Sequence, residues 1–187
     1  DAADVALLND VVNAGLVNDA GQPALQGSGT NTGDPQVTLL NGSSALINTR
    51  RYRHLTFTLT LDTPFGLDGN LGQGSLARVL WGSQSGQDAT TMTATNDLLI
   101  WPGRNTYTVD LSTLSAANLG LETECPHCPT LPWMNHSVRF FRIDPHEATT
   151  GVTFRLAQVK LSASDEVAAG GTKRIVGLVT ASQIALA

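Results

Sequence analysis

Two cysteines three residues apart form the most chemically suggestive motif of this chain, Cys125-Pro126-His127-Cys128. A C-x2-C pair works as a redox dithiol where it opens a helix, because the helix N-terminus lowers the pKa of the first thiol. Here prolines recur through 126–132, and such a stretch does not form that helix. The sequence therefore favours a local disulfide between Cys125 and Cys128 in an exported protein. Redox catalysis stays open as an alternative.

The same C-x2-C spacing is half of a zinc site, which His127 or His136 could extend. A structural zinc ion needs four ligands, and the chain has only these 2 cysteines. We therefore predict no metal ligand in the chain and no resident cofactor, with zinc left as the alternative at this motif.

A second candidate follows an apolar stretch and reads Asp144-Pro145-His146-Glu147. Two acids could serve a glycosidase only if a pair of carboxylates lay about 5–10 Å apart across a cleft. A metal site would need a third ligand to converge with His146 and a carboxylate. Asp followed by Pro is also a common way to begin a turn. No Gly-x-Ser-x-Gly, His-Glu-x-x-His or phosphate-binding glycine motif is present, so we predict that the chain is not an enzyme.

Aromatic side chains are the other residues that could bind a ligand, because an aromatic ring stacks on the apolar face of a sugar. Alternation along its strand places Trp81 in the core. Trp101, before Pro-Gly, is expected to plug one end of the fold, whereas Trp133 lies in the longest irregular stretch and is expected to be exposed. The candidate carbohydrate-binding residues are Trp133, Arg78, Asp144, His146 and Glu147.

Short strands must position these residues. In 55–61 apolar residues alternate with threonine, which puts Leu and Phe on one face and threonines on a face that can meet water. Similar runs recur, separated by stretches rich in Gly, Asn, Asp, Ser and Pro, at 36–40, 75–81, 105–111, 137–144 and 152–161. Many short strands with almost no helical periodicity predict an all-β chain, an antiparallel β-sandwich or jelly roll.

The two ends of the chain differ from its middle. A turn at 18–21 predicts a hairpin that joins 12–17 to 24–27. We expect one sandwich domain over 1–163, followed over 164–187 by a linker and an apolar strand at 174–180. That strand either closes the sandwich or begins a following domain.

Composition excludes some partners. The 187 residues carry a net charge of -5, and a surface that binds nucleic acid needs clustered Lys and Arg, so no nucleic-acid partner is predicted. No apolar run approaches the roughly 20 residues that span a bilayer. The sequence begins with Asp and has no signal-like segment, so it is expected to be part of a longer or processed chain.

The stretch from Tyr52 to Leu161 resembles carbohydrate-binding modules of the galactose-binding-like jelly-roll class. The likeness lies in three segments: 51–57, which resembles the strand that opens the main sheet; 101–111, a turn and a strand that ends in Asp-Leu; and 141–145 with 152–161, which resemble the last two strands. The resemblance implies a non-catalytic module that binds a polysaccharide or glycan, in a secreted or cell-surface bacterial protein. The alternative is a β-sandwich spacer that does not bind sugar.

In one place the chain departs from this family. Many such modules carry a carboxylate on the closing strand that helps to hold a structural calcium ion, whereas 156–159 here contains no acid. Calcium prefers several oxygen ligands that include carboxylates. No calcium site is therefore predicted on the closing strand, although Asp1, Asp4 and Asp165 could supply ligands if the two termini meet.

Overall fold

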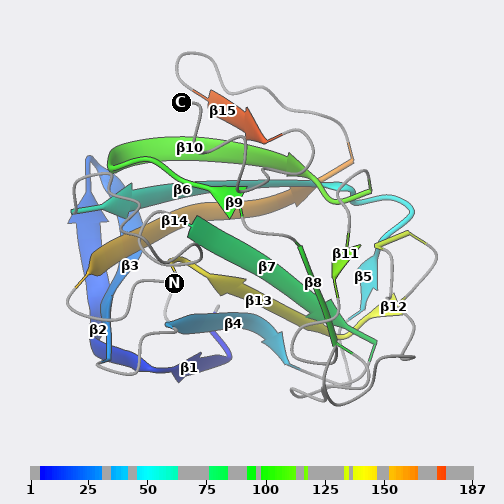
Figure 1. Ribbon diagram of the computed structural model, residues 1–187, viewed down its shortest axis with the longest axis horizontal. Coiled ribbons are helices and arrows are strands. Elements are labelled where there is room, and N and C mark those ends of the chain that lie inside the picture. Colours follow the sequence, from blue (N-terminus) through cyan, green and yellow to red (C-terminus); the bar gives the residue numbers. More distant parts are fainter. Residues whose placement is uncertain are drawn as a thin grey trace.

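A computed structural model describes residues 5–30, 35–41, 46–62, 76–83, 92–95, 98–112, 116–117, 133–134, 137–146, 152–163 and 172–175. Two β-sheets pack face to face, and the core lies between them (Figure 1). The described residues contain strands and turns but no helix, and so no helix that could cross a membrane. The predicted all-β sandwich is therefore confirmed.

The first sheet has the strand order β1-β4-β13-β7-β8-β11, with β9 paired to β7. Its strands are β1 (Leu7–Asn9), β4 (Gln36–Asn41), β13 (Phe140–Asp144), β7 (Leu76–Gly82), β8 (Met92–Thr95), β11 (Ala116–Ala117) and β9 (Leu98–Leu99).

The second sheet has the order β15-β10-β6-β14-β3-β2. Its strands are β15 (Thr172–Ile175), β10 (Gly103–Asp110), β6 (His54–Leu61), β14 (Thr153–Ser162), β3 (Gln22–Gly29) and β2 (Val11–Asp19). A small ribbon pairs β5 (Ile47–Asn48) with β12 (Ser137–Val138). The neighbouring strands of the described residues pair antiparallel, except that β10 and β15 run parallel.

In strand β6 the apolar residues of the alternating sequence pattern face the core. Leu55, Phe57 and the other apolar residues of this strand are at most 1% exposed, as the alternation predicts. On the opposite face Thr58 and Thr60 are also buried, so their expected exposure to water is wrong. Neighbouring side chains cover them, because the Thr58 hydroxyl lies 2.8 Å from that of Thr106 and donates to the Gln158 side-chain oxygen.

The predicted hairpin near the N-terminus is confirmed as β2 and β3. The Asn18 side-chain oxygen accepts a hydrogen bond of 2.7 Å from the Gly21 N–H and so fixes the turn. Figure 1 shows this hairpin standing steeply against the ends of β6 and β10, at the left of the view. The hairpin is part of the second sheet, and its tip is thereby placed beside the ends of β6 and β10.

Gly27 on β3 is needed because two side chains lie where its Cβ would be. An added Cβ would stand 2.4 Å from Val11 Cγ1 and 3.0 Å from the Phe154 ring. Gly27→Ala is therefore expected to lower the free energy of unfolding by about 1–3 kcal/mol through overpacking. Urea unfolding measures this change, and Gly15→Ala, whose Cβ would meet no atom within 4 Å, is the control.

Near the C-terminus, β15 pairs in parallel with β10 and extends the second sheet at its edge. Residues 172–175 thus add to the sandwich. The boundary between 1–163 and 164–187, and the role of residues beyond 175, stay predictions.

Candidate functional site

The structure places Trp133, the residue expected to be exposed, inside the sandwich. Its side chain is 1% exposed and meets Trp81 and Phe141 edge-on, with ring centroids 5.5 and 5.9 Å away. The indole Nε1–H donates a hydrogen bond of 2.7 Å to the Tyr52 carbonyl. The expected exposure is wrong, because the core supplies both ring partners and an acceptor for this indole.

The other predicted site residues lie on or just after the first sheet. Arg78 on β7 is half-buried and aligns with Asp144 on β13, so these two are neighbours. Asp144 is 1% exposed, however, and Arg142 donates to its carboxylate at 2.6 Å. His146 is fully buried. The structure thus brings Arg78 and Asp144 together but withdraws the carboxylate and the imidazole from solvent.

Several predicted features lie outside the described residues: Glu147, the cysteines Cys125 and Cys128, and the calcium candidates Asp1, Asp4 and Asp165. Their proposed roles, including the disulfide, stay predictions. Among the residues that the structure does describe, no three His, Cys, Asp or Glu side chains gather to hold a metal ion.

A different aromatic side chain reaches solvent. Trp101 precedes β10 and is 36% exposed, the only aromatic among the exposed large apolar residues of the described ranges. Its ring lies nearly parallel to that of Tyr107, with centroids 6.4 Å apart and an angle of 19°. The backbone N–H of Trp101 donates a hydrogen bond of 2.8 Å to the Tyr107 hydroxyl. A buried tyrosine thus holds an exposed tryptophan.

The turn that carries Trp101 is braced by Asn105. The Asn105 side-chain amide donates to the carbonyls of Trp101 and Pro102, at 3.3 and 3.1 Å. Gly103 has a φ of +76°, a conformation that residues with a side chain rarely adopt. These features turn the chain sharply from Trp101 into β10.

Tyr107 anchors this turn in the core. Its ring also stacks on Phe57, with centroids 5.3 Å apart. Burial raises the pKa of the Tyr107 hydroxyl, although hydrogen bonding to Trp101 and Asn105 lowers it in part. The protonated hydroxyl accepts a hydrogen bond from the Trp101 backbone N–H and donates one to the Trp101 carbonyl.

Three residues after Trp101, a network of charged side chains begins. Arg104 Nε donates to Asp19 Oδ2 at 3.1 Å, and the Thr60 hydroxyl donates to the same oxygen at 2.8 Å. Arg155 Nε lies 3.4 Å from Asp19 Oδ1, and its guanidinium also donates to Asp62. We call these five residues the Asp19 network. It joins the hairpin tip to β6, β10 and β14.

The Asp19 network combines hydrogen-bonding groups that remain partly open to solvent. The side chains of Arg104 and Asp62 are 34% and 48% exposed, whereas that of Asp19 is 12% exposed. Two guanidinium groups face two carboxylates, so the formal charges balance. Trp101 precedes Arg104 by three residues, but its ring stacks on Tyr107, which faces the core, whereas Arg104 aligns with Thr60 on the opposite face of the second sheet. An exposed aromatic face can bind a polar ring that has one apolar face.

Comparison with known proteins bears on the fold. No protein-family model matches the sequence, and no curated protein matches it either. The fold is shared with part of two agarases.

The agarase AgWH50C has a TM-score of 0.52 at 14% identity, over 87% of this chain and 23% of that one. An exo-beta-agarase has a TM-score of 0.50 at 10% identity, over 85% and 23%. The chain therefore spans 23% of the length of each agarase. The family 11 carbohydrate-binding module of the cellulosomal cellulase Lic26A-Cel5E of Clostridium thermocellum matches at a TM-score of 0.47 and 11% identity, over 81% of both chains.

Reasoning from sequence missed Trp101 as an exposed residue. Its segment, Trp101-Pro102-Gly103-Arg104-Asn105, does carry a signal, since Pro-Gly predicts a turn that can hold a side chain at the surface. No sequence signal could have identified the partner of Arg104, because Asp19 lies 85 residues away in sequence.

Proposed function

We propose that this domain is a non-catalytic module that binds a glycan through Trp101. The observation that carries the proposal is the exposed indole of Trp101, which the ring and hydroxyl of Tyr107 hold in place. Such a site needs no movement of the ring to receive a sugar. It replaces Trp133 as the proposed stacking residue, because Trp133 is buried.

Two further arguments support a glycan ligand. The Asp19 network, which begins three residues after Trp101, presents hydroxyl, guanidinium and carboxylate groups, and these form hydrogen bonds with sugar hydroxyls in both directions. The shared fold with part of two agarases agrees with a role in a protein that handles polysaccharide, outside the cell or at its surface. The module would then hold a longer protein near its substrate.

Trp101→Ala is expected to weaken retention on a polysaccharide by about tenfold or more, because the stacking and the buried apolar area are both lost. Affinity electrophoresis of the wild-type chain in gels with agarose, cellulose, xylan or mannan first identifies a ligand. Binding through a single ring is expected to be weak, roughly millimolar. The retention of Trp101→Ala is then measured on that ligand.

Val12→Ala is the matched control, because Val12 is also an exposed apolar residue, 43% exposed, and lies outside the proposed site. It is expected to keep wild-type retention. If Trp101→Ala bound as well as Val12→Ala, the proposed contact would be wrong. If no polysaccharide slowed the wild-type chain, the domain would instead be a structural spacer.

A further inference from the structure

Asn105 occupies a position on β10 where the strand pattern calls for an apolar residue. It aligns with Leu59 of β6, which lies in the core. Two positions further on, Tyr107 aligns with Phe57, and both of these rings are buried in the core. Because side chains two residues apart share a face of a strand, Asn105 belongs to the core-facing row, yet it is polar and half-buried. Packing against the core therefore does not account for an amide at this position.

The contacts of this amide lie in the turn that carries Trp101. The side-chain nitrogen of Asn105 donates to three consecutive carbonyl oxygens, those of Trp101, Pro102 and Gly103, at 3.3, 3.1 and 3.5 Å. Hydrogen bonding with the same side chain also lowers in part the raised pKa of the Tyr107 hydroxyl. One amide thus joins the backbone of the turn to the tyrosine on which the indole stacks.

We propose that Asn105 is a positioning residue for the indole of Trp101, an inference that rests on the proposed glycan function. Its amide fixes the backbone of the turn, and the backbone determines where the indole lies. A ring that is already ordered loses less conformational freedom when a sugar binds. Ordering one mobile side chain costs about two- to tenfold in affinity. Asn105 acts through Trp101 and not by its own contact with the sugar.

Asn105→Asp tests the donor, because it keeps the size of the side chain and replaces the NH2 group with an acceptor oxygen. The new carboxylate faces carbonyl oxygens, so it repels the turn. Affinity for the polysaccharide that binds the wild-type chain is expected to fall roughly two- to tenfold, and Asn105→Ala is expected to lower it by a similar factor. Affinity electrophoresis measures both, with each mobility divided by that in a gel without polysaccharide. Circular dichroism at the same temperature checks that each variant is folded.

Fluorine NMR of the chain labelled with 5-fluorotryptophan observes the indole directly. The chain has 3 tryptophans, and the resonance that is missing from Trp101→Phe identifies that of Trp101. In Asn105→Asp this resonance is expected to shift and broaden, because the ring samples several positions. The resonances of the buried Trp81 and Trp133 are expected to stay unchanged. A role in overall stability alone would not move the Trp101 resonance of the folded protein.

Asn48→Ala is the matched control at another turn. The Asn48 side-chain oxygen accepts a hydrogen bond of 3.2 Å from the Arg51 N–H, so this asparagine also braces a turn. The turn precedes β6, whose first residue, His54, aligns with Asp110 at the end of β10, whereas Trp101 precedes the beginning of β10. Asn48→Ala is expected to keep the wild-type retention and the wild-type Trp101 resonance.

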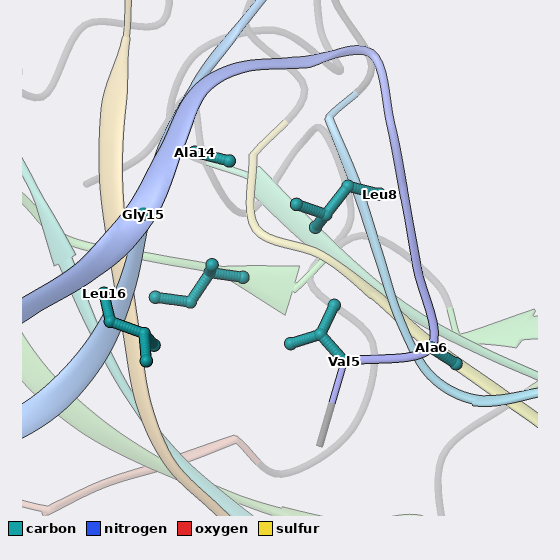
Figure 2. A pocket seen from close by; sticks show the side chains of 7 residues that line it. Val5, Ala6, Leu8, Ala14, Gly15 and Leu16 are labelled. Carbon is teal, nitrogen blue, oxygen red and sulfur yellow. The ribbon is translucent and has the colours of Figure 1, made fainter. Parts of the chain in front are cut away.

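A second control concerns unspecific apolar contact with the polysaccharide. An apolar hollow lies between the segment that leads into β1 and the hairpin strands β2 and β3, and the side chains of Val5, Leu8 and Leu16 surround it (Figure 2). Leu16 is 52% exposed, but the side chains of the hollow offer no hydrogen-bond partners for sugar hydroxyls. Leu16→Ala is therefore expected to keep the wild-type retention.

Three results would overturn the positioning role and leave the glycan function intact. The first is wild-type retention of Asn105→Asp and Asn105→Ala on a polysaccharide that Trp101→Ala no longer binds. The second is a Trp101 resonance that neither variant changes. The third is an equal loss of retention in Asn48→Ala, which would assign the effect to overall destabilisation. A wild-type chain that no polysaccharide retains would overturn the glycan function instead, and the fluorine spectra would then show on their own whether Asn105 orders the indole.

Discussion

Trp133→Ala is expected to lower the free energy of unfolding by about 3–5 kcal/mol, the usual cost of removing a large aromatic side chain from a core. The indole is 1% exposed and packs on Trp81 and Phe141, so the substitution leaves a cavity between aromatic rings. It also removes the donor to the Tyr52 carbonyl. Urea unfolding followed by circular dichroism measures the change.

Trp133→Phe separates the two contributions, because it keeps an aromatic ring and removes only the N–H donor and part of the volume. It is expected to cost less than Trp133→Ala. Trp101→Ala serves as the comparison at an exposed tryptophan and is expected to cost less still. A loss below about 1 kcal/mol for Trp133→Ala would mean that the indole lies in solvent, as its sequence context predicted.

The strands of the sandwich were predictable because their signal is local. In β6 an alternation of two residues fixes which side chains face the core, and the neighbouring strands repeat it. The hairpin of β2 and β3 was likewise visible as a turn between two extended runs. Each of these features depends on residues close in sequence, which is what pattern reasoning can detect.

The candidate site was not predictable to the same degree, because its contacts join distant segments. Trp133 stands in a proline-rich stretch without periodicity, and only the tertiary structure supplies Trp81 as its ring partner. Similarly, the pairing of Asp19 with Arg104 depends on a hairpin that stands steeply against β6 and β10. Irregular sequence therefore does not imply an exposed side chain.

The threonines of β6 also show what a sequence pattern does not predict. Alternation assigned these residues correctly to the face opposite the core, but it did not show what would cover them. Thr58 is buried by contacts with Thr106 and Gln158, and Thr60 by its hydrogen bond to Asp19. Periodicity identifies a face of a strand, whereas exposure depends on neighbours that the period does not specify.

His146 is expected to make the domain less stable in mild acid, by about 3 kcal/mol between pH 7 and pH 4. Burial lowers the pKa of this imidazole from 6.5 to about 4, and a hydrogen bond with the Val152 backbone opposes the shift in part. The ring packs edge-on against Phe154, with centroids 5.9 Å apart. The folded protein therefore keeps His146 neutral where the unfolded chain protonates it.

The sign of the effect follows from proton binding. Above about pH 6.5 the imidazole is neutral in both the folded and the unfolded state, so His146 adds no pH dependence to the free energy of unfolding. As the pH falls from 6.5 to about 4, the unfolded chain binds a proton that the folded protein does not, and stability declines. Below about pH 4 both states are protonated and the decline ends.

Urea unfolding of the wild type and of His146→Gln at pH 7.0, 5.5 and 4.0 measures this contribution as a difference between two curves. The other side chains of the protein are the same in both variants, so their contributions to the pH dependence largely cancel in the difference. His146→Gln is expected to be less stable at pH 7 and to lose about 3 kcal/mol less than the wild type on going to pH 4. Parallel curves for the two proteins would show that the imidazole is protonated equally in the folded and unfolded states, and so is not buried as a neutral group.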